Sequence, residues 1–147
     1  MNFCSSVLLS KTIGIANFTT MDIESVRTYC LSLPQAMEDF PFDETTLAFR
    51  VGGRIFAMLD LERTEWFVLK CEPSYALELR EQYAEISGAW HMNKRHWNQL
   101  NLYGMLPDRL VKHLICHSYN EVIKKMPKRQ KAEWGLQCVA EEMPQLE

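Results

Sequence analysis

Two adjacent glycines inside an alternating apolar run constrain the fold more strongly than any other feature. Residues 46–51 and 55–59 alternate side chains with the period of a β-strand. Gly52 and Gly53 fall between the two runs, where a tight hairpin turn favours glycine at both central positions. The segment therefore predicts an antiparallel hairpin, so the chain must build a sheet.

Helical periodicity flanks this hairpin on both sides. Asp22 is a plausible N-cap, and apolar residues recur at helical spacing from Ile23 until Pro34 stops the pattern. Pro73 predicts a second helix that runs through about Tyr83, because proline is favoured in a first helical turn.

Further strands and a long helix complete the predicted order. Residues 66–70 predict a third strand, and residues 86–105 lack helical periodicity and predict one or two more. Pro107 and Asp108 start the longest helix, which ends before Pro127. Helices and strands in this order favour an α+β fold.

Length and composition bound the size and setting of the fold. The chain has 147 residues, 47% of them hydrophobic, and fits one domain, since single cores typically hold about 100–200 residues. We expect residues 1–21 to be an N-terminal extension, residues 22–131 to form the domain and residues 132–147 to be an acidic tail. The five cysteines form no CxxC pair, which indicates a reducing, cytoplasmic setting. No apolar run reaches the roughly 18–20 residues that cross a bilayer, so no membrane contact is expected.

The net charge of −3 conceals a strong asymmetry along the chain. Residues 1–85 carry seven Lys and Arg against thirteen Asp and Glu, whereas residues 86–131 carry nine against two. Residues 132–147 carry four acidic residues and no basic one. A basic third can attract a polyanion even in an acidic protein, because exposed charges act locally. The alternative is a solvated basic surface balanced by the acidic half.

Catalytic and metal-binding patterns are weak. His113 and His117 are spaced as in zinc-binding helices, but no third ligand is marked, so a solvated polar helix face that also holds Asn120 is favoured. The acidic residues Asp39, Asp43 and Glu44 are interpreted as a hydrated loop, because no partner base or nucleophile can be named. No glycine-rich phosphate loop or nucleophile elbow occurs. We therefore expect a non-enzymatic protein without catalytic residues, metal or cofactor.

Residues 91–98, HMNKRHWN, concentrate groups that bind nucleic acids. The segment combines phosphate-binding cations, an aromatic ring and amides that can hydrogen-bond to base edges. In the alternative interpretation it is a structural loop in which Trp97 packs in the core and Asn93 caps a turn. A core position is favoured for Trp97, whereas Lys94 and Arg95 are neighbouring cations that cannot easily both be buried.

Several of these motifs occur together in a known family. The chain resembles the MmcQ/YjbR family over about residues 22–131, where these motifs follow one another in the same order. The NKRHW sequence of residues 93–97 is the most specific part of the resemblance. The position after Phe42, where glycine is expected in that family, is Asp43. The resemblance implies a CyaY-like α+β fold, an antiparallel sheet with helices packed on one face in a proposed double-wing arrangement, and a DNA-binding function without a catalytic residue. It rests on the segments DFPF (39–42), FRVGGRIF (49–56), LKCEP (69–73), HMNKRHWN (91–98), Ser118-Tyr119 and MPKR (126–129).

The sequence thus predicts a monomeric protein that binds DNA through a basic surface. Six residues are the candidates for phosphate contact: Lys94, Arg95, His96, Lys128, Arg129 and Lys131. Two alternatives use the same basic face, namely an interaction module with an acidic protein partner and a small-molecule binding domain.

Overall fold

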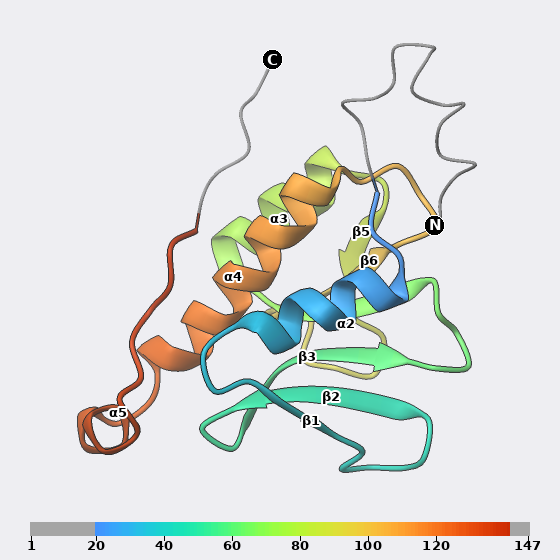
Figure 1. Cartoon of the computed structure of the whole chain (residues 1–147). Helices are drawn as coiled ribbons and strands as arrows, with labels where there is room; N and C mark the ends of the chain where they lie inside the picture. Colours follow the sequence, from blue (N-terminus) through green and yellow to red (C-terminus); the bar gives the residue numbers. More distant parts are fainter. Residues whose placement is uncertain (1–19, 142–147) are drawn as a thin grey trace, which may run out of the picture.

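A six-stranded antiparallel sheet lies at the centre of the computed structural model, which describes residues 20–141 (Figure 1). The strand order is β1-β2-β3-β4-β6-β5, and every neighbouring pair is antiparallel. The strands are β1 (Met37–Asp39), β2 (Thr46–Val51), β3 (Arg54–Asp60), β4 (Trp66–Lys70), β5 (Ile86–Gly88) and β6 (Trp97–Asn101).

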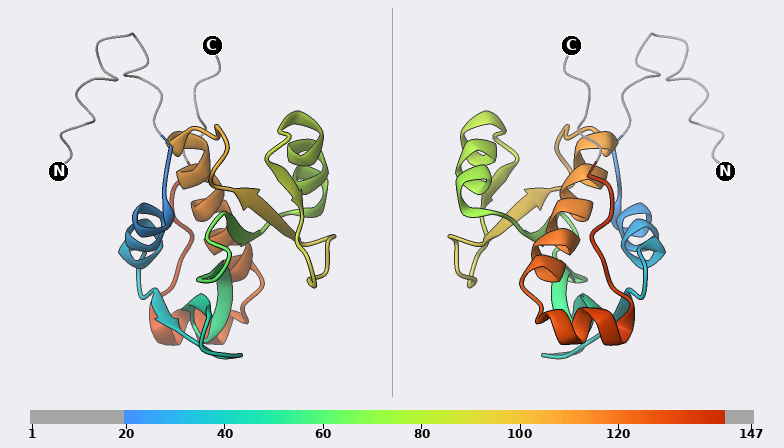
Figure 2. Two further views of the ribbon diagram at one scale, coloured as in Figure 1. Left: turned by 90° about the vertical axis from the view of Figure 1, so that its right-hand side faces the viewer. Right: turned by 90° about the vertical axis from the view of Figure 1, so that its left-hand side faces the viewer.

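Helices α2 and α4 cover one face of this sheet, as the two side views show (Figure 2). Helix α3 packs beside β5 and reaches α4 through Tyr75, whose hydroxyl lies 2.9 Å from His113 Nε2. The described helices are α2 (Ile23–Ser32), α3 (Pro73–Gln82), α4 (Asp108–Lys124) and α5 (Lys128–Trp134). The predicted α+β fold with helices on one face of an antiparallel sheet is confirmed.

Helix α2 begins where the sequence predicted. The N–H of Ser25 donates to Asp22 Oδ1 at 2.8 Å, which satisfies one of the free N–H groups of the first turn. This hydrogen bond lowers the pKa of Asp22. The predicted N-cap is therefore correct.

The hairpin of β2 and β3 turns at Gly52 and Gly53, both with positive φ. A side chain at Gly52 would meet the end of the flexible Met126 side chain, which can shift, so glycine is favoured there mainly by the positive φ. One residue departs from the predicted alternation. Phe49 pairs with Ala57 and Arg50 with Ile55, so Phe56 is an extra residue in a β-bulge. The bulge allows both Phe56 and Ala57 to be fully buried.

Tyr119 of α4 joins the sheet to the first helical segment. Its side chain is fully buried and packs edge-on against Phe56, with ring centroids 5.5 Å apart. The Tyr119 hydroxyl donates to the Pro34 carbonyl at 2.7 Å, just after α2. One side chain thus fixes α4, the bulge and the end of α2 relative to one another.

The polar stripe of α4 is not a solvated face, contrary to the prediction. His113, His117 and Asn120 are buried. His117 Nε2 accepts the N–H of Glu72 at 3.1 Å, and its Nδ1 lies 3.0 Å from Glu141 Oε1. Because Nε2 is an acceptor, Nδ1 carries the proton and donates to Glu141.

The segment that buries His117 and Asn120 of α4 belongs to the predicted acidic tail, residues 132–147. Asn120 donates to the Val139 carbonyl and accepts the Val139 N–H, each at 2.8 Å, and Leu136 is buried. The packed chain therefore continues to Glu141, beyond the expected boundary at residue 131. At the other end Met21 is buried, whereas residues 1–19 lie outside the described part, so most of the predicted extension is not described.

The Tyr119 hydroxyl can be tested by mutation. We expect Tyr119→Phe to lower the free energy of unfolding by about 1–2 kcal/mol, because the Pro34 carbonyl loses its donor. Urea denaturation measures this loss. Tyr103→Phe is the control, since Tyr103 is 72% exposed, and should change stability by less than about 0.5 kcal/mol. Equal losses in the two variants would contradict the assigned role.

The docking of residues 136–141 should depend on pH. Burial raises the pKa of Glu141, but hydrogen bonds from Asn120 and His117 outweigh it, so the pKa lies below the ordinary 4.5. A carboxylate of this kind stabilises the docked state above its unfolded pKa, and the stabilisation is lost as pH falls through the folded value. The protection factor of the Val139 amide against exchange should therefore fall below about pH 4.5 before those of core amides do.

The variant Glu141→Gln separates this effect from general acid unfolding. It should accelerate amide exchange at Val139 at pH 6 by about tenfold at most. The factor is limited because Glu141 is partly exposed and solvent screens its charge. Glu133→Gln removes an equal charge from an exposed position and should leave the exchange rate unchanged. If both variants exchange at the wild-type rate, Glu141 does not hold the segment.

Candidate nucleic-acid interface

The six predicted phosphate-binding residues lie on two separate elements. Lys94 and Arg95 are exposed, and His96 is half-buried, in the loop between β5 and β6. The second group, Lys128, Arg129 and Lys131, lies on α5, where the first two are exposed and the third is half-buried. The basic ending after Pro127 is therefore helical, which the sequence analysis did not predict.

The loop before β6 is held firmly against α3. Asn93 Oδ1 accepts the N–H of Arg95 at 3.0 Å, so Asn93 does cap a turn. Arg80 of α3 donates to the Lys94 carbonyl and, at 2.7 Å, to Asn98 Oδ1. The Lys94 stem packs on Gly88. These contacts fix the backbone of the loop and leave the charged ends of Lys94 and Arg95 in solvent.

Trp97 is half-buried rather than a core residue, so the favoured interpretation was wrong. It pairs with Lys70 across β6 and β4, and the Lys70 ammonium lies 5.6 Å from the centroid of its ring. Along β4 the buried side chains are Phe67 and Leu69, so Lys70 points to the opposite, open face of the sheet. The ring thus supports a cation instead of filling the core.

Lys70 brings together cations that are far apart in the sequence. Burial lowers the pKa of Lys70, and repulsion from Lys125 and Arg54 lowers it further. These three residues come from β4, the end of α4 and β3. Lys125 and Arg54 are thus close enough to repel Lys70, and the carboxylate of Glu121 offsets part of this repulsion.

Helix α5 extends this positive region. Gln130 Nε2 donates to the Gly52 carbonyl at 3.0 Å, which places α5 against the turn between β2 and β3 (left in Figure 1). We call Arg54, Lys70, Lys125, Lys128 and Arg129 together the basic end. Within residues 20–141 the ion pairs shorter than 4.0 Å involve other cations. The five cations of the basic end form no ion pair of this length, although Glu121, which pairs with Lys124 at 3.6 Å, attracts Lys70 and offsets part of the positive charge.

Two of the five cations of the basic end could not be found from charge counts. Arg54 and Lys70 belong to the acidic first 85 residues, and only strand pairing brings them to the basic third. The sequence did indicate where these two cations lie on the sheet, because Arg54 follows the glycine turn and Lys70 ends the third predicted strand. Lys94 and Arg95 lie on the neighbouring loop, three and two residues before Trp97.

Two acidic residues of the predicted hydrated loop make local contacts. Asp43 Oδ1 accepts the N–H groups of Thr45 and Thr46, and Asp39 pairs with Arg50 at 3.0 Å. Both carboxylates therefore serve the exposed loop between β1 and β2. Among residues 20–141, no three His, Cys, Asp or Glu side chains lie close enough to share a metal ion. In the same range, no helix has the length and apolar character to cross a bilayer.

Comparison with known proteins places the chain in a family. The YjbR family model matches residues 31–121. The chain belongs to the YjbR family. It is 30% identical over 112 residues to the Escherichia coli K12 protein YjbR, covering 76% of this chain and 95% of that one. It is also 30% identical over 107 residues to YbdF of Escherichia coli O157:H7, covering 72% and 88%.

Solved structures agree with the YjbR assignment. The crystal structure of a Deinococcus radiodurans protein with a DUF419 domain matches with a TM-score of 0.77 and 34% identity, over 83% of this chain and 94% of that one. A Pseudomonas syringae protein has the same fold, with a TM-score of 0.57 and 24% identity over 67% and 96%. The expected family and its α+β fold are therefore confirmed for this YjbR-family chain.

The half-buried position of Trp97 has a measurable consequence. Trp97→Ala should lower the free energy of unfolding by less than about 2 kcal/mol, because the Trp97 side chain is only partly buried and lies outside the hydrophobic core. Phe67→Ala is the reference, since Phe67 is fully buried, and should lose about 3–5 kcal/mol. Guanidinium denaturation of both variants compares them. A loss for Trp97→Ala as large as that of Phe67→Ala would show that Trp97 is a core residue.

Proposed function

We propose that this YjbR-family protein binds DNA through the basic end, as a monomer and without catalysis. The observation that carries the proposal is the convergence of Lys70, Lys125 and Arg54 with the exposed cations of α5 at one end of the sheet, where no ion pair shorter than 4.0 Å engages them within residues 20–141. Burial lowers the pKa of Lys70, and repulsion from Lys125 and Arg54 lowers it further. A phosphate oxygen placed among them would relieve that repulsion. The family match supports the fold that positions these groups, not the ligand.

The arrangement suits contact with a phosphate backbone rather than with base edges. Lys128 and Arg129 are exposed at the start of α5, and Lys70 lies over the Trp97 ring on the open face of the sheet. Exposed cations on separate elements can contact successive phosphates of one strand, which gives affinity with little sequence preference. The loop cations Lys94 and Arg95 would extend the contact past Trp97.

Salt dependence of binding tests the proposal quantitatively. If about four phosphates are neutralised, the log-log plot of affinity against salt should have a slope near −3.6 on duplex DNA. Removing two contacts with Lys125→Gln and Arg129→Gln should reduce this slope by about 1.8. Fluorescence anisotropy of a labelled mixed-sequence duplex, between about 50 and 200 mM salt, measures both values.

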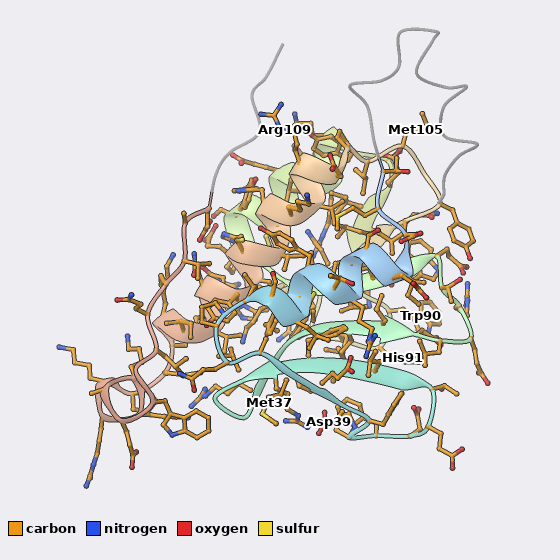
Figure 3. All side chains as sticks on the ribbon, viewed as in Figure 1. Met37, Asp39, Trp90, His91, Met105 and Arg109 are labelled. Atoms are coloured by element: carbon orange, nitrogen blue, oxygen red, sulfur yellow. The ribbon has the colours of Figure 1, made fainter. Side chains whose placement is uncertain are left out.

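A matched control removes equal charge elsewhere. Arg109→Gln with Lys112→Gln lowers the net charge by the same amount at the other end of α4, where Arg109 lies far from α5 (Figure 3). This double variant should keep the wild-type slope. A third double variant, Lys94→Gln with Arg95→Gln, reports whether bound DNA reaches the loop before β6. Equal slopes for the first variant and the control would contradict a localised site.

An acidic protein partner is the competing function. It would use the same cations and would also weaken with salt, so salt alone does not separate the two. Competition does, because excess unlabelled duplex displaces labelled DNA but has no place in a protein-specific site. If the wild-type protein shows no affinity for DNA or RNA at low salt, the interaction module becomes the better account of the basic end.

A further inference from the structure

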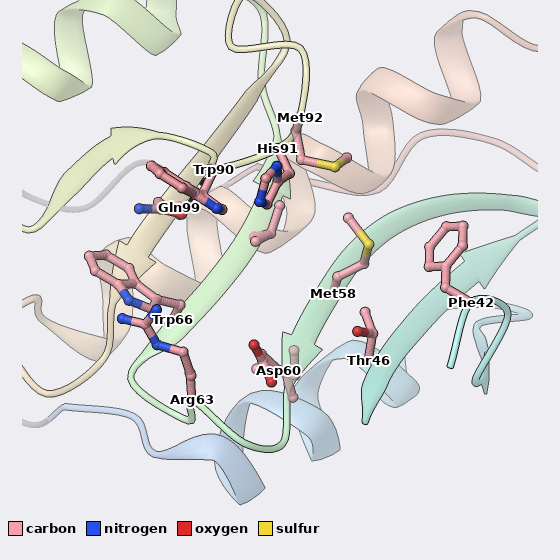
Figure 4. Close-up of a pocket in the computed structure, with 12 residues that line it drawn as sticks. Phe42, Thr46, Met58, Asp60, Arg63, Trp66, Trp90, His91, Met92 and Gln99 are labelled. Carbon is pink, nitrogen blue, oxygen red and sulfur yellow. Dashed lines mark hydrogen bonds between the residues drawn. The ribbon is translucent and has the colours of Figure 1, made fainter. Parts of the chain in front are cut away.

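A groove lies on the open face of the sheet, next to Lys70 and Trp97 but lined by other residues (Figure 4). Its floor is formed by Met58 of β3 and Val68 of β4, which pair across the sheet on the face that α4 does not cover. Trp90 and His91 stand beside it, on the side of the molecule remote from α5 (Figure 3). The volume of about 500 Å³ falls within the range of small-molecule sites.

Aromatic side chains from three separate segments surround this groove. Trp66 begins β4, Trp90 follows β5, and Phe42 comes from the loop between β1 and β2. Trp90 is 71% exposed and Phe42 67% exposed, although both are large and apolar. Exposed aromatic residues gathered around one hollow are typical of a binding site.

The groove wall at Trp90 is fixed before any ligand arrives. Gln99 Oε1 accepts the N–H of Trp90 at 3.1 Å, and Gln99 Nε2 donates to Ser87 Oγ at 3.3 Å. Both ends of this amide are therefore used inside the protein. Thr46 is used similarly, because its hydroxyl lies 3.3 Å from Asp43 Oδ2.

One negative charge remains at the groove. Asp60 Oδ1 accepts the N–H of Glu62 at 2.9 Å, and within residues 20–141 no ion pair shorter than 4.0 Å involves Asp60. The one cationic lining residue, Arg63, lies 3.5 Å from Glu65, which offsets its charge. The lining itself is formally neutral, because Asp60 and Arg63 carry opposite charges, and the adjoining Glu65 brings this edge of the groove to a net charge of −1. The groove therefore combines aromatic walls with an acidic edge.

We propose that this groove binds an organic cation with an apolar or aromatic body. Aromatic faces attract ammonium groups through their quadrupole, and a nearby carboxylate adds a direct ion pair. The apolar floor of Met58 and Val68 takes the body of the ligand. A nucleotide is disfavoured, because Asp60 and the neighbouring Asp43 and Glu62 repel phosphate. The site is separate from the basic end and does not depend on DNA binding.

Three probes with one carbon skeleton test the assignment: 2-phenylethylammonium, neutral 2-phenylethanol and anionic phenylacetate. Titrations of the ¹⁵N-labelled full chain follow the indole N–H signals of its four tryptophans. Trp66 and Trp90 should shift, whereas Trp97 and Trp134 should not. The cation should bind about tenfold or more tightly than the alcohol, and phenylacetate should bind most weakly.

Two variants and a control decide the role of the carboxylate. Asp60→Asn keeps the hydrogen bond to Glu62 but loses the charge, so the cation and the alcohol should then bind within about twofold of each other. Trp90→Ala should weaken all three probes. Glu62→Gln removes an equal charge just outside the groove and should keep the tenfold preference. A cation preference that survives Asp60→Asn, binding of phenylacetate or a nucleoside monophosphate at Trp66 and Trp90, or no saturable shift at all would overturn the proposal.

Discussion

The contact between α4 and the bulged strand β3 is the interaction on which the rest of the structure depends. Phe56 can reach Tyr119 only because the bulge places it on the same side of the sheet as Ala57. Tyr119 then holds the carbonyl of Pro34, which fixes the end of α2. With α4 held on one face, β2, β3 and β4 present their other side chains on the open face. Both proposed sites draw on this arrangement: the groove and Lys70 lie on the open face, and Lys125 follows the end of α4.

The buried polar stripe of α4 shows how a polar surface can become part of the interior. His117 and Asn120 are buried because the segment up to Glu141 supplies their hydrogen-bond partners. A buried polar group is tolerated when it is paired, and here the pairs fix the position of the segment. His117 therefore has a structural role, which its helical spacing from His113 did not reveal.

Local patterns predicted the fold well and the sites only in part. Period-two alternation, the glycine pair and the Asp22 cap are short-range signals, and each element that they predicted is present. The short strand β1 and the helix α5 carry too few residues to show a period. The bulge at Phe56, the half-buried Trp97 and the burial of His117 depend on partners distant in sequence. The basic end mixes Arg54 and Lys70 with residues beyond 120, so no count along the chain could have assembled it.

The central claim is that DNA binds at the basic end and not at the groove, and the tryptophan side chains report the two places separately. Titrating the ¹⁵N-labelled protein with a short unlabelled duplex at low salt is the most direct measurement. If DNA binds at the basic end, the indole signal of Trp97 and the amide signals of Gly52 and Gly53 should shift, while the indole signals of Trp66 and Trp90 should stay in place. Shifts confined to Trp66 and Trp90, or a spectrum unchanged by DNA, would contradict it.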